Sequence, residues 1–295
     1  MPTIKEHAHL PIGVFDSGMG GLTVLRELMT ALPEESFIYL GDTARLPYGT
    51  KSQETVKQYA LQMASLLINL DIKLLVVACN TATTAALPYL KKKFPQLPII
   101  GVVEPGAKAA VKITRNKKIA LLATETTIRS HIYQNLIYEY DPEIEIIPQS
   151  CGLFVALAEE GSVNDDIAVA ACKKYLTPLL DHAKPCDSLI LGCTHFPVLI
   201  KPIQALLGNH VQIINSAKET ALVVESTLIN IQQRATHTAI PTKTFLVTDL
   251  PERFIRIGEL FLGQPINPDH VLLVDAQHPH PPRAEYVDSK AHDNN

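Results

Sequence analysis

The sequence predicts an α/β protein made of two similar units, each with a mostly parallel sheet. Short apolar runs alternate with stretches of helical periodicity, the alternation begins again near residue 119, and 295 residues suit two domains. Strands separated by helices are typical of parallel sheets with crossover helices. Ligands of such sheets bind beyond the carboxyl ends of the strands, so we expect the units to face a central cleft.

The first unit begins with a buried strand that ends in a carboxylate, Ile12–Asp16. Further strands are expected where short apolar runs are bounded by turn residues, at Phe37–Leu40, Leu74–Ala78 and Ile99–Val103. Helices are expected where apolar residues recur every three to four positions, after the turn Ser17–Gly21, behind Thr50 and from Thr81 to Pro95. Thr50 and Gln53 have the spacing of a capping box for the second helix.

The second unit repeats this alternation. Its strands are expected at Ile119–Ala123, Glu143–Pro148, Ser188–Gly192 and Val211–Ile214. Its helices are expected at Thr126–Tyr140, at Asn164–His182 with an interruption near Pro178, and from Pro197 to Leu207.

A third stretch of the chain completes one of the two units. Ser216 and Glu219 form a capping box for a helix that reaches about Gln232. A strand at Thr244–Val247 and a helix from Pro251 that Gly263 ends are expected next. The periodicity alone does not decide which unit receives these elements.

Composition excludes several classes of protein. With 46% apolar and 19% charged residues, the chain is not intrinsically disordered. A net charge of −4 argues against a dedicated nucleic-acid or anionic-membrane binder. The uncharged run Leu74–Leu90 is too polar for a membrane span, and the first residues lack the apolar core of a secretory signal. Five widely spaced cysteines do not suit a disulfide framework, so we expect a reduced, cytoplasmic protein.

Two cysteines follow two of the predicted strands in the same way. LLVVACNT (Leu74–Thr81) and SLILGCTH (Ser188–His195) each run from an apolar strand through a small residue to Cys79 or Cys193. If the units face each other, one thiol from each side reaches the cleft. Stereoinversion at a carbon needs such a pair, because one group removes a proton from one face and the other delivers a proton to the opposite face. The alternative is burial in the core, which we expect for the other three cysteines.

Two loops and a histidine add polar groups to the same cleft. The loop Asp16–Gly21 (DSGMGG) precedes a helix, whose free N–H groups suit a carboxylate or a phosphate, although neither a phosphate-loop GK[ST] nor GxGxxG is present. The polar loop Gly41–Gly49 follows a strand, and His195 would shuttle a proton or stabilise charge. Ordinary turns and a structural histidine are the alternatives. Cys193 and His195 lack the second ligand pair of a zinc site.

Several motifs, taken together and in order, resemble glutamate racemases of the aspartate/glutamate racemase family. They span about residues 11–263 and are DSGMGGLTV (Asp16–Val24), GDTARLPYG (Gly41–Gly49), ACNTATT (Ala78–Thr84), GVVEPG (Gly101–Gly106), ATETTIRSHIY (Ala123–Tyr133), LGCTHFP (Leu191–Pro197) and VTDLPERF (Val247–Phe254). The resemblance implies an isomerase that interconverts L- and D-glutamate without a cofactor or metal. It also implies a supply of D-glutamate for peptidoglycan, and thus for cell-wall biogenesis and cell shape.

The resemblance further implies roles for single residues. The catalytic thiols fall on Cys79 and Cys193, with Asp16 assisting the first and His195 the second. An assisting acid falls within Cys151–Gly161, at Glu159 rather than Glu160. The implied substrate contacts are Asp16 and Ser17, Tyr48 and Gly49, Asn80 and Thr81, and Thr194 and His195.

By the same resemblance, residues 1–100 and 215–265 form the first domain and residues 101–214 the second. Residues 266–295, rich in Pro and His, are left as a flexible tail. Glutamate is the implied partner. A homodimer and activation by a cell-wall precursor are left open.

Three other functions compete with this interpretation. A related two-thiol enzyme, such as an aspartate or hydantoin racemase or maleate isomerase, would act on a different substrate. An acyl-transfer enzyme with Cys193 as nucleophile and His195 as base would leave Cys79 unused. A small-anion binder would use the glycine-rich loop but neither thiol.

Overall fold

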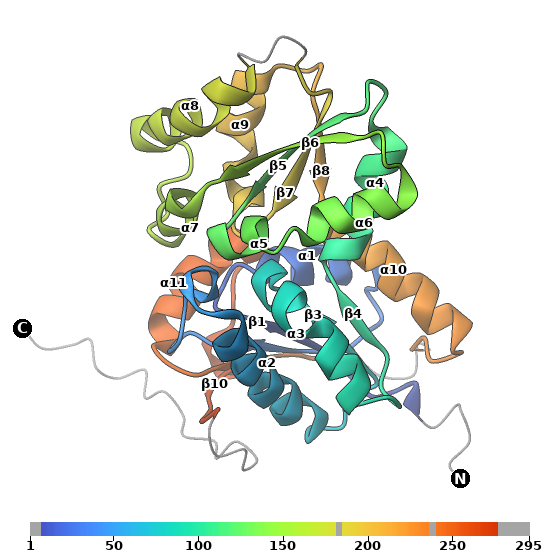
Figure 1. Cartoon of the computed structure of the whole chain (residues 1–295). Helices are drawn as coiled ribbons and strands as arrows, with labels where there is room; N and C mark the ends of the chain where they lie inside the picture. Colours follow the sequence, from blue (N-terminus) through green and yellow to red (C-terminus); the bar gives the residue numbers. More distant parts are fainter. Residues whose placement is uncertain (1–6, 181–184, 236–239, 277–295) are drawn as a thin grey trace, which may run out of the picture.

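Two parallel β-sheets, one above the other in Figure 1, carry helices on both of their faces. The computed structural model describes residues 7–180, 185–235 and 240–276. Within these residues, every pairing between strands is parallel. This arrangement confirms the predicted fold class of two α/β units.

The first sheet has six strands in the order β10-β9-β2-β1-β3-β4. Their bounds are β1 Ile12–Asp16, β2 Phe37–Gly41, β3 Leu74–Val77, β4 Ile99–Gly101, β9 Lys243–Val247 and β10 Val271–Leu273. The surrounding helices are α1 Leu22–Ala31, η2 Tyr48–Thr50, α2 Gln53–Ile68, α3 Asn80–Lys93, α10 Ser216–Asn230, α11 Pro251–Leu262 and η4 Pro268–His270. One apolar core lies under α1, α10 and α11, and another lies under α2 and α3. β1 is buried on both faces, which explains its continuous apolar run.

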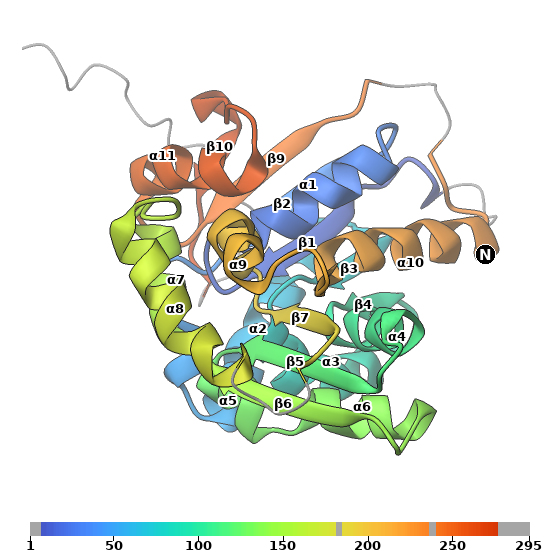
Figure 2. The ribbon, with the colours of Figure 1, turned by 90° about the horizontal axis from the view of Figure 1, so that it is seen from above.

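The second sheet has four strands in the order β6-β5-β7-β8. Their bounds are β5 Lys118–Ala123, β6 Glu145–Ser150, β7 Ser188–Gly192 and β8 Gln212–Asn215. The helices around them are α4 Val103–Ile113, α5 Glu125–Arg129, α6 Ile132–Tyr140, α7 Gly152–Glu159, α8 Asp166–Leu180, η3 Phe196–Leu199 and α9 Ile200–Leu207. α7, α8 and α9 cover one face, and α4 and α6 cover the other (Figure 2).

The two sheets take their strands from different stretches of the chain. Residues 12–101 and 243–273 supply the first sheet, and residues 118–215 supply the second. The domain boundaries given above stay a prediction. The expected tail from residue 266 contains a further strand, because β10 pairs with β9, and residues 277–295 lie outside the described residues.

Two helices begin at a cap other than the predicted one. Ser52, not Thr50, caps α2 and accepts a hydrogen bond from the Thr55 N–H at 3.3 Å. Asn215, not Ser216, caps α10 through the Ala217 N–H at 3.1 Å. In each case the cap is the extended residue directly before the first helical one.

The second unit differs from the prediction in its helices. The expected helix Thr126–Tyr140 is split into α5 and α6, because His131 has a left-handed φ of 54°. α4 and α7 were not expected, and the strand expected at Ile99–Val103 ends at Gly101. Pro178 lies inside α8 and does not interrupt it.

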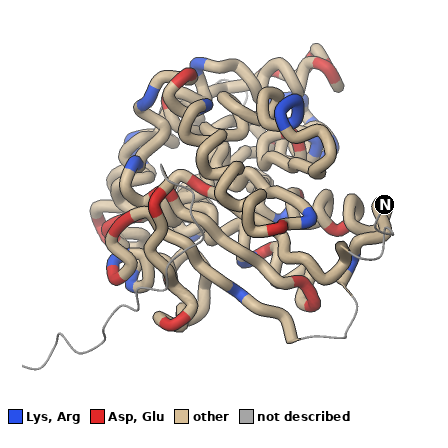
Figure 3. Tube along the Cα trace, turned by 90° about the horizontal axis from the view of Figure 1, so that it is seen from below, with Lys and Arg blue, Asp and Glu red and all other residues tan. Residues whose placement is uncertain are grey.

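Two further observations bear on the classes of ligand considered above. In the part of the chain that the structure describes, no helix is long and apolar enough to cross a bilayer, and no group of three or more His, Cys, Asp or Glu residues could hold a metal ion. Both acidic and basic positions are spread over the trace seen from below (Figure 3).

Candidate active site

A small pocket lies where the carboxyl ends of β1 and β3 meet that of β7, and it contains both Cys79 and Cys193. Its lining residues are Ser17, Leu46, Pro47, Tyr48, Gly49, Cys79, Asn80, Thr81, Thr124, Val155, Glu159, Cys193, Thr194 and His195. Every site residue implied by the resemblance is among them except Asp16, which lies buried behind the pocket.

The volume of this pocket is about 20 Å³, which is the space of one or two water molecules. Glutamate needs more room than this, so the pocket must widen before the substrate can bind. A larger cavity of about 320 Å³ lies by the carboxyl ends of α1 and α11, but neither cysteine nor histidine lines it. The small pocket, which is lined by both cysteines and His195, is therefore the candidate active site.

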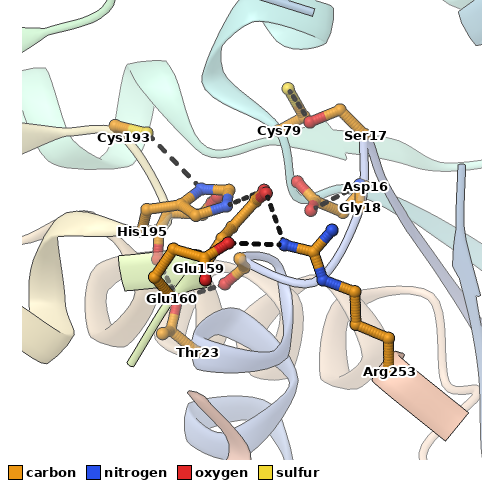
Figure 4. Close-up of polar contacts among 12 residues, drawn as sticks. Asp16, Ser17, Gly18, Thr23, Cys79, Glu159, Glu160, Cys193, His195 and Arg253 are labelled. Atoms are coloured by element: carbon orange, nitrogen blue, oxygen red, sulfur yellow. Dashed lines mark hydrogen bonds and ion pairs between the residues drawn. The ribbon is translucent and has the colours of Figure 1, made fainter. Parts of the chain in front are cut away.

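Cys79 stands directly before α3 and caps its first turn. Its sulfur accepts a hydrogen bond from the Ala82 N–H at 3.4 Å. The same sulfur donates to the Ser17 hydroxyl at 3.5 Å (Figure 4). Burial, together with the negative charge of Asp16, raises the pKa of Cys79 to about 12, against the lowering effect of both hydrogen bonds. Cys79 is therefore a thiol at neutral pH.

Asp16 ends β1 and is fully buried. Its Oδ2 accepts a hydrogen bond from the Gly18 N–H at 3.0 Å, and Oδ1 has no hydrogen-bond partner among the described residues. Burial raises the pKa of Asp16, although the charge of His195 and backbone N–H groups act in the opposite direction. A carboxyl group with one free oxygen thus lies close behind Cys79.

Cys193 follows β7 and lies beside a histidine that a carboxylate holds. The Cys193 sulfur is 3.8 Å from His195 Nδ1, and His195 Nε2 is 3.1 Å from Glu159 Oε1 (Figure 4). Burial acts to lower the pKa of His195, but the hydrogen bonds to Cys193 and Glu159 and their charges outweigh it and raise the pKa to about 10. His195 therefore carries a positive charge at neutral pH next to the Cys193 sulfur.

The glycine-rich loop lets α1 approach the second sheet's active-site loop closely. A Cβ atom on Gly20 would lie 2.3 Å from His195 Nδ1 and 2.6 Å from Thr194 Oγ1. At Gly21, a Cβ atom would lie 2.5 Å from the Asp16 Cβ. These glycines therefore serve close packing of backbone against both acid–base groups.

Hydrogen bonds join the two halves around the pocket. Tyr133 donates to Asn80 Oδ1 at 2.8 Å, and the hydroxyls of Thr81 and Thr124 are 3.2 Å apart. Thr23 donates to the carbonyl of Thr194 at 2.9 Å. These bonds hold the two thiol-bearing loops on either side of one small space.

The Tyr48–Gly49 segment forms another wall of the pocket. The Tyr48 hydroxyl donates to Asp42 Oδ2, which also accepts from Arg45 Nε at 2.7 Å. Gly49 lies against Thr124, since a Cβ atom there would be 2.9 Å from the Thr124 Cβ. The network of Asp42 and Arg45 thus fixes the loop that the GDTARLPYG motif marks.

Sequence reasoning missed four lining residues and one charged neighbour of the site. Leu46, Pro47 and Thr124 lie inside the quoted motifs, so the motifs located them without indicating their place in the pocket. Val155 lies on α7, four positions before Glu159, in a helix that was not expected. Arg253 of α11 approaches Glu159 Oε2 at 3.9 Å.

Comparisons with known proteins agree with this geometry. The sequence profile of the family described as Asp/Glu/Hydantoin racemase matches residues 12–224. The glutamate racemase of Geobacter metallireducens is 44% identical over 266 residues, which are 90% of this chain and 97% of that protein.

Two solved structures are similar over nearly their whole length. Glutamate racemase from Francisella tularensis in complex with D-glutamate matches with a TM-score of 0.84 and 36% identity, covering 91% of this chain and 98% of that one. Escherichia coli glutamate racemase in complex with L-glutamate and the activator UDP-MurNAc-Ala matches with a TM-score of 0.72 and 30% identity, covering 85% and 95%.

Proposed function

This chain belongs to the Asp/Glu/Hydantoin racemase family, and on that premise we propose that it interconverts L- and D-glutamate by passing protons between Cys79, Cys193 and the α-carbon. One observation carries the proposal. Two thiols, one from each sheet, line a single pocket and have different acid–base partners. Neither an acyl-transfer site nor an anion-binding site needs that second thiol.

In the L-to-D direction, Cys193 acts as the base. Its thiolate takes the α-proton of L-glutamate and becomes a thiol, leaving the electron pair on the α-carbon. The Cys79 thiol then delivers its proton to the opposite face and becomes a thiolate, so D-glutamate forms and the proton count balances. The D-to-L direction runs the same steps in reverse.

The surroundings of each cysteine fit these roles. The high pKa of Cys79 keeps its proton available for donation. The positive charge of His195 stabilises negative charge on the Cys193 sulfur, while Glu159 orients the imidazole from its far side. Asp16 acts in the opposite sense from His195, because its negative charge favours the protonated form of Cys79. Each pair of cysteine and assisting group would occupy one side of the α-carbon.

Polar groups of the pocket would bind the substrate. Ser17, Asn80, Thr81 and Thr194 offer hydroxyl, amide and backbone groups to the amino and carboxylate groups of glutamate. Tyr48 and Gly49 would close the pocket around the rest of the molecule. Because these groups can be satisfied only by a polar ligand, they favour an amino acid over an apolar substrate.

We further propose a cytoplasmic role in supplying D-glutamate for peptidoglycan, and thus in cell-wall biogenesis and cell shape. The activator bound to the Escherichia coli relative supports regulation of this chain by a cell-wall precursor of the same kind. A homodimer stays a prediction from the resemblance. Adding UDP-MurNAc-Ala to the assay and measuring the mass of the protein in solution test these two points.

The central test uses purified protein dialysed against a chelator and treated with a carbonyl reagent that traps pyridoxal phosphate. Incubation with L-glutamate, followed by chiral chromatography, should give equal amounts of both enantiomers. Parallel incubations with L-aspartate and a hydantoin separate this function from the related racemases, which would act on those compounds instead. Activity that returns only with pyridoxal phosphate or a metal would contradict the cofactor-free mechanism.

A further inference from the structure

Arg253 reaches from a helix of the first half to a helix of the second. It lies on α11, and its Nη2 is 3.3 Å from Glu160 Oε1 and 3.9 Å from Glu159 Oε2, both at the end of α7 (Figure 4). The Glu160 side chain is 76% exposed, whereas that of Glu159 is 10% exposed. The contact with Glu160 is thus a surface ion pair, whereas the contact with Glu159 connects Arg253 to a residue that lines the pocket.

The Glu159 carboxylate is shared between two cations. Its Oε2 faces Arg253, and its Oε1 accepts from His195 Nε2 at 3.1 Å. The other ring nitrogen of His195 faces the Cys193 sulfur at 3.8 Å. A movement of the carboxylate would therefore turn the imidazole relative to the thiol.

α11, the helix that carries Arg253, also packs against the imidazole of His195. The rings of Phe261 and His195 are 5.3 Å apart and nearly perpendicular. α11 thus contacts the acid–base group of Cys193 once directly and once through Glu159. The 20 Å³ pocket must open for glutamate to enter, and separation of the halves would break both contacts.

We propose that Arg253 is a positioning residue that couples closure of the two halves to the orientation of Glu159 and His195 beside Cys193. The inference rests on the proposed function, because it concerns the assistance that His195 gives to Cys193. Arg253 does not line the pocket, so it acts through Glu159 and leaves the substrate contacts in place.

The kinetic test compares Arg253→Met with Arg256→Met, which removes an exposed arginine one turn further along the same helix. Arg253→Met should lower kcat about three- to fivefold, as expected for a partly exposed charge interaction. It should change KM for glutamate by less than about twofold. Arg253→Lys should restore part of kcat because it keeps the charge without the planar fork. Arg256→Met and Glu160→Gln should leave kcat within about twofold of the wild-type value.

A double-mutant cycle separates this role from a general effect on the fold. If Arg253 acts through Glu159, Arg253→Met should lower kcat by less than about twofold in a Glu159→Gln background. An equal fold loss in both backgrounds, or a wild-type kcat for Arg253→Met, would overturn the inference.

A spectroscopic readout needs no activity. The ¹⁵N chemical shifts of the His195 ring, assigned by comparison with His195→Gln, should change in Arg253→Met and not in Arg256→Met. Unchanged His195 signals in Arg253→Met would overturn the inference even if racemisation is observed. Absence of racemisation in the wild-type protein, with shifted His195 signals, would instead overturn the proposed function and leave the Arg253–Glu159–His195 coupling supported.

Discussion

Cys79 and Cys193 are the same chemical group in opposite electrostatic surroundings. Cys79 lies near the carboxyl group of Asp16, and burial raises its pKa to about 12. Cys193 lies beside His195, whose pKa is raised to about 10. The closed form without substrate therefore holds a proton on the first sulfur and a positive charge beside the second. This is the state that, under the proposed mechanism, accepts L-glutamate.

Replacing either cysteine by Ala should abolish racemisation, because one face of the α-carbon then has no proton donor. The remaining thiol can still remove a proton and return one to the same face. In deuterated water, Cys79→Ala should therefore incorporate deuterium only into L-glutamate, and Cys193→Ala only into D-glutamate. Chiral chromatography coupled to mass spectrometry measures both enantiomers.

The same experiment tests the paired-thiol mechanism and, independently, the assignment of each thiol to one face of the α-carbon. Substantial racemisation by either Ala variant would refute the paired-thiol mechanism. Exchange into the opposite enantiomers would reverse the assignment of faces and keep the pair. Cys172→Ala, which changes a buried thiol in α8, is the matched control and should retain racemisation.

The raised pKa of His195 makes its contribution to stability depend on pH. Its folded-state pKa of about 10 lies above the unfolded value near 6.5, so the contribution is complete below about pH 6.5 and is lost as pH rises through about 10. The difference in unfolding free energy between wild type and His195→Gln should therefore shrink by about 2–4 kcal/mol over that range.

Urea unfolding at about pH 6 and about pH 10 measures this difference. His270→Gln, a change at an exposed histidine in η4, is the control and should show no such trend. A difference between wild type and His195→Gln that grows with pH would contradict the charged state assigned to His195.

At the scale of elements, the approach of α1 to the β7–η3 loop depends on Gly20. Gly20→Ala would place a Cβ atom within 2.3 Å of His195 Nδ1, so either the helix or the imidazole must move. We expect a large loss of racemase activity and a loss of about 1–3 kcal/mol in unfolding free energy. Activity assays and urea unfolding measure the two effects.

Gly152→Ala in α7 provides the matched control. A Cβ atom there meets nothing within 4 Å, so activity and stability should be unchanged or slightly raised. Wild-type activity in Gly20→Ala would show that the close packing against His195 is not required.

Strands were easier to predict than helices because most strands here are buried and uniformly apolar. β1 and β7 match their predicted bounds, because an apolar run bounded by polar or small residues can be recognised from the local sequence alone. α4 was missed because Glu104, Pro105 and Gly106 interrupt its start with residues that also suit a turn. The break at His131 depends on a backbone conformation that no local pattern indicates.

For the site, the sequence indicated which loops meet but not how their side chains pair. Cys79 and Cys193 could be found because each follows a strand that is recognisable on its own. The resemblance implied His195 and Glu159 as separate assisting groups, and their pairing was not predicted because the two lie on different elements. Arg253 lies inside the quoted motif VTDLPERF, but its place beside the site could not be predicted. Its partners lie on a helix of the other half, and salt bridges between distant segments leave no spacing pattern.

For the whole molecule, a buried ion pair ties distant segments together at the edge of the first sheet opposite the pocket. Lys73 Nζ lies 2.5 Å from Glu35 Oε2 and donates to the carbonyls of Ala8 at 2.7 Å and Gln233 at 2.9 Å. Glu35 Oε1 accepts from the Ala235 N–H at 2.8 Å. The pair thus joins the segment before β1, the start of β3, the segment before β2 and the end of α10.

Lys73→Met should lower the unfolding free energy by about 3–5 kcal/mol, because it leaves the Glu35 carboxylate buried without its cation. Urea unfolding measures this loss, and a Glu35→Leu/Lys73→Met double variant should recover part of it. Arg129→Met, which breaks an exposed pair with Glu125, should cost less than about 1 kcal/mol. If Lys73→Met lowers the unfolding free energy no more than Arg129→Met does, the buried Lys73–Glu35 pair does not stabilise the fold.

The order in which the strands occur along the chain has a consequence for how the protein is made. β2 gains its outer neighbour only when β9, from residues 243–247, has left the ribosome, whereas the second sheet is complete once residue 215 has emerged. A nascent chain between these two points carries a finished second sheet and a first sheet with an unpaired edge, which is a template for pairing with other chains. α11, which brings Arg253 and Phe261 to the pocket, is synthesised later still. The surroundings of Cys193 can therefore assemble only after α11 has been synthesised.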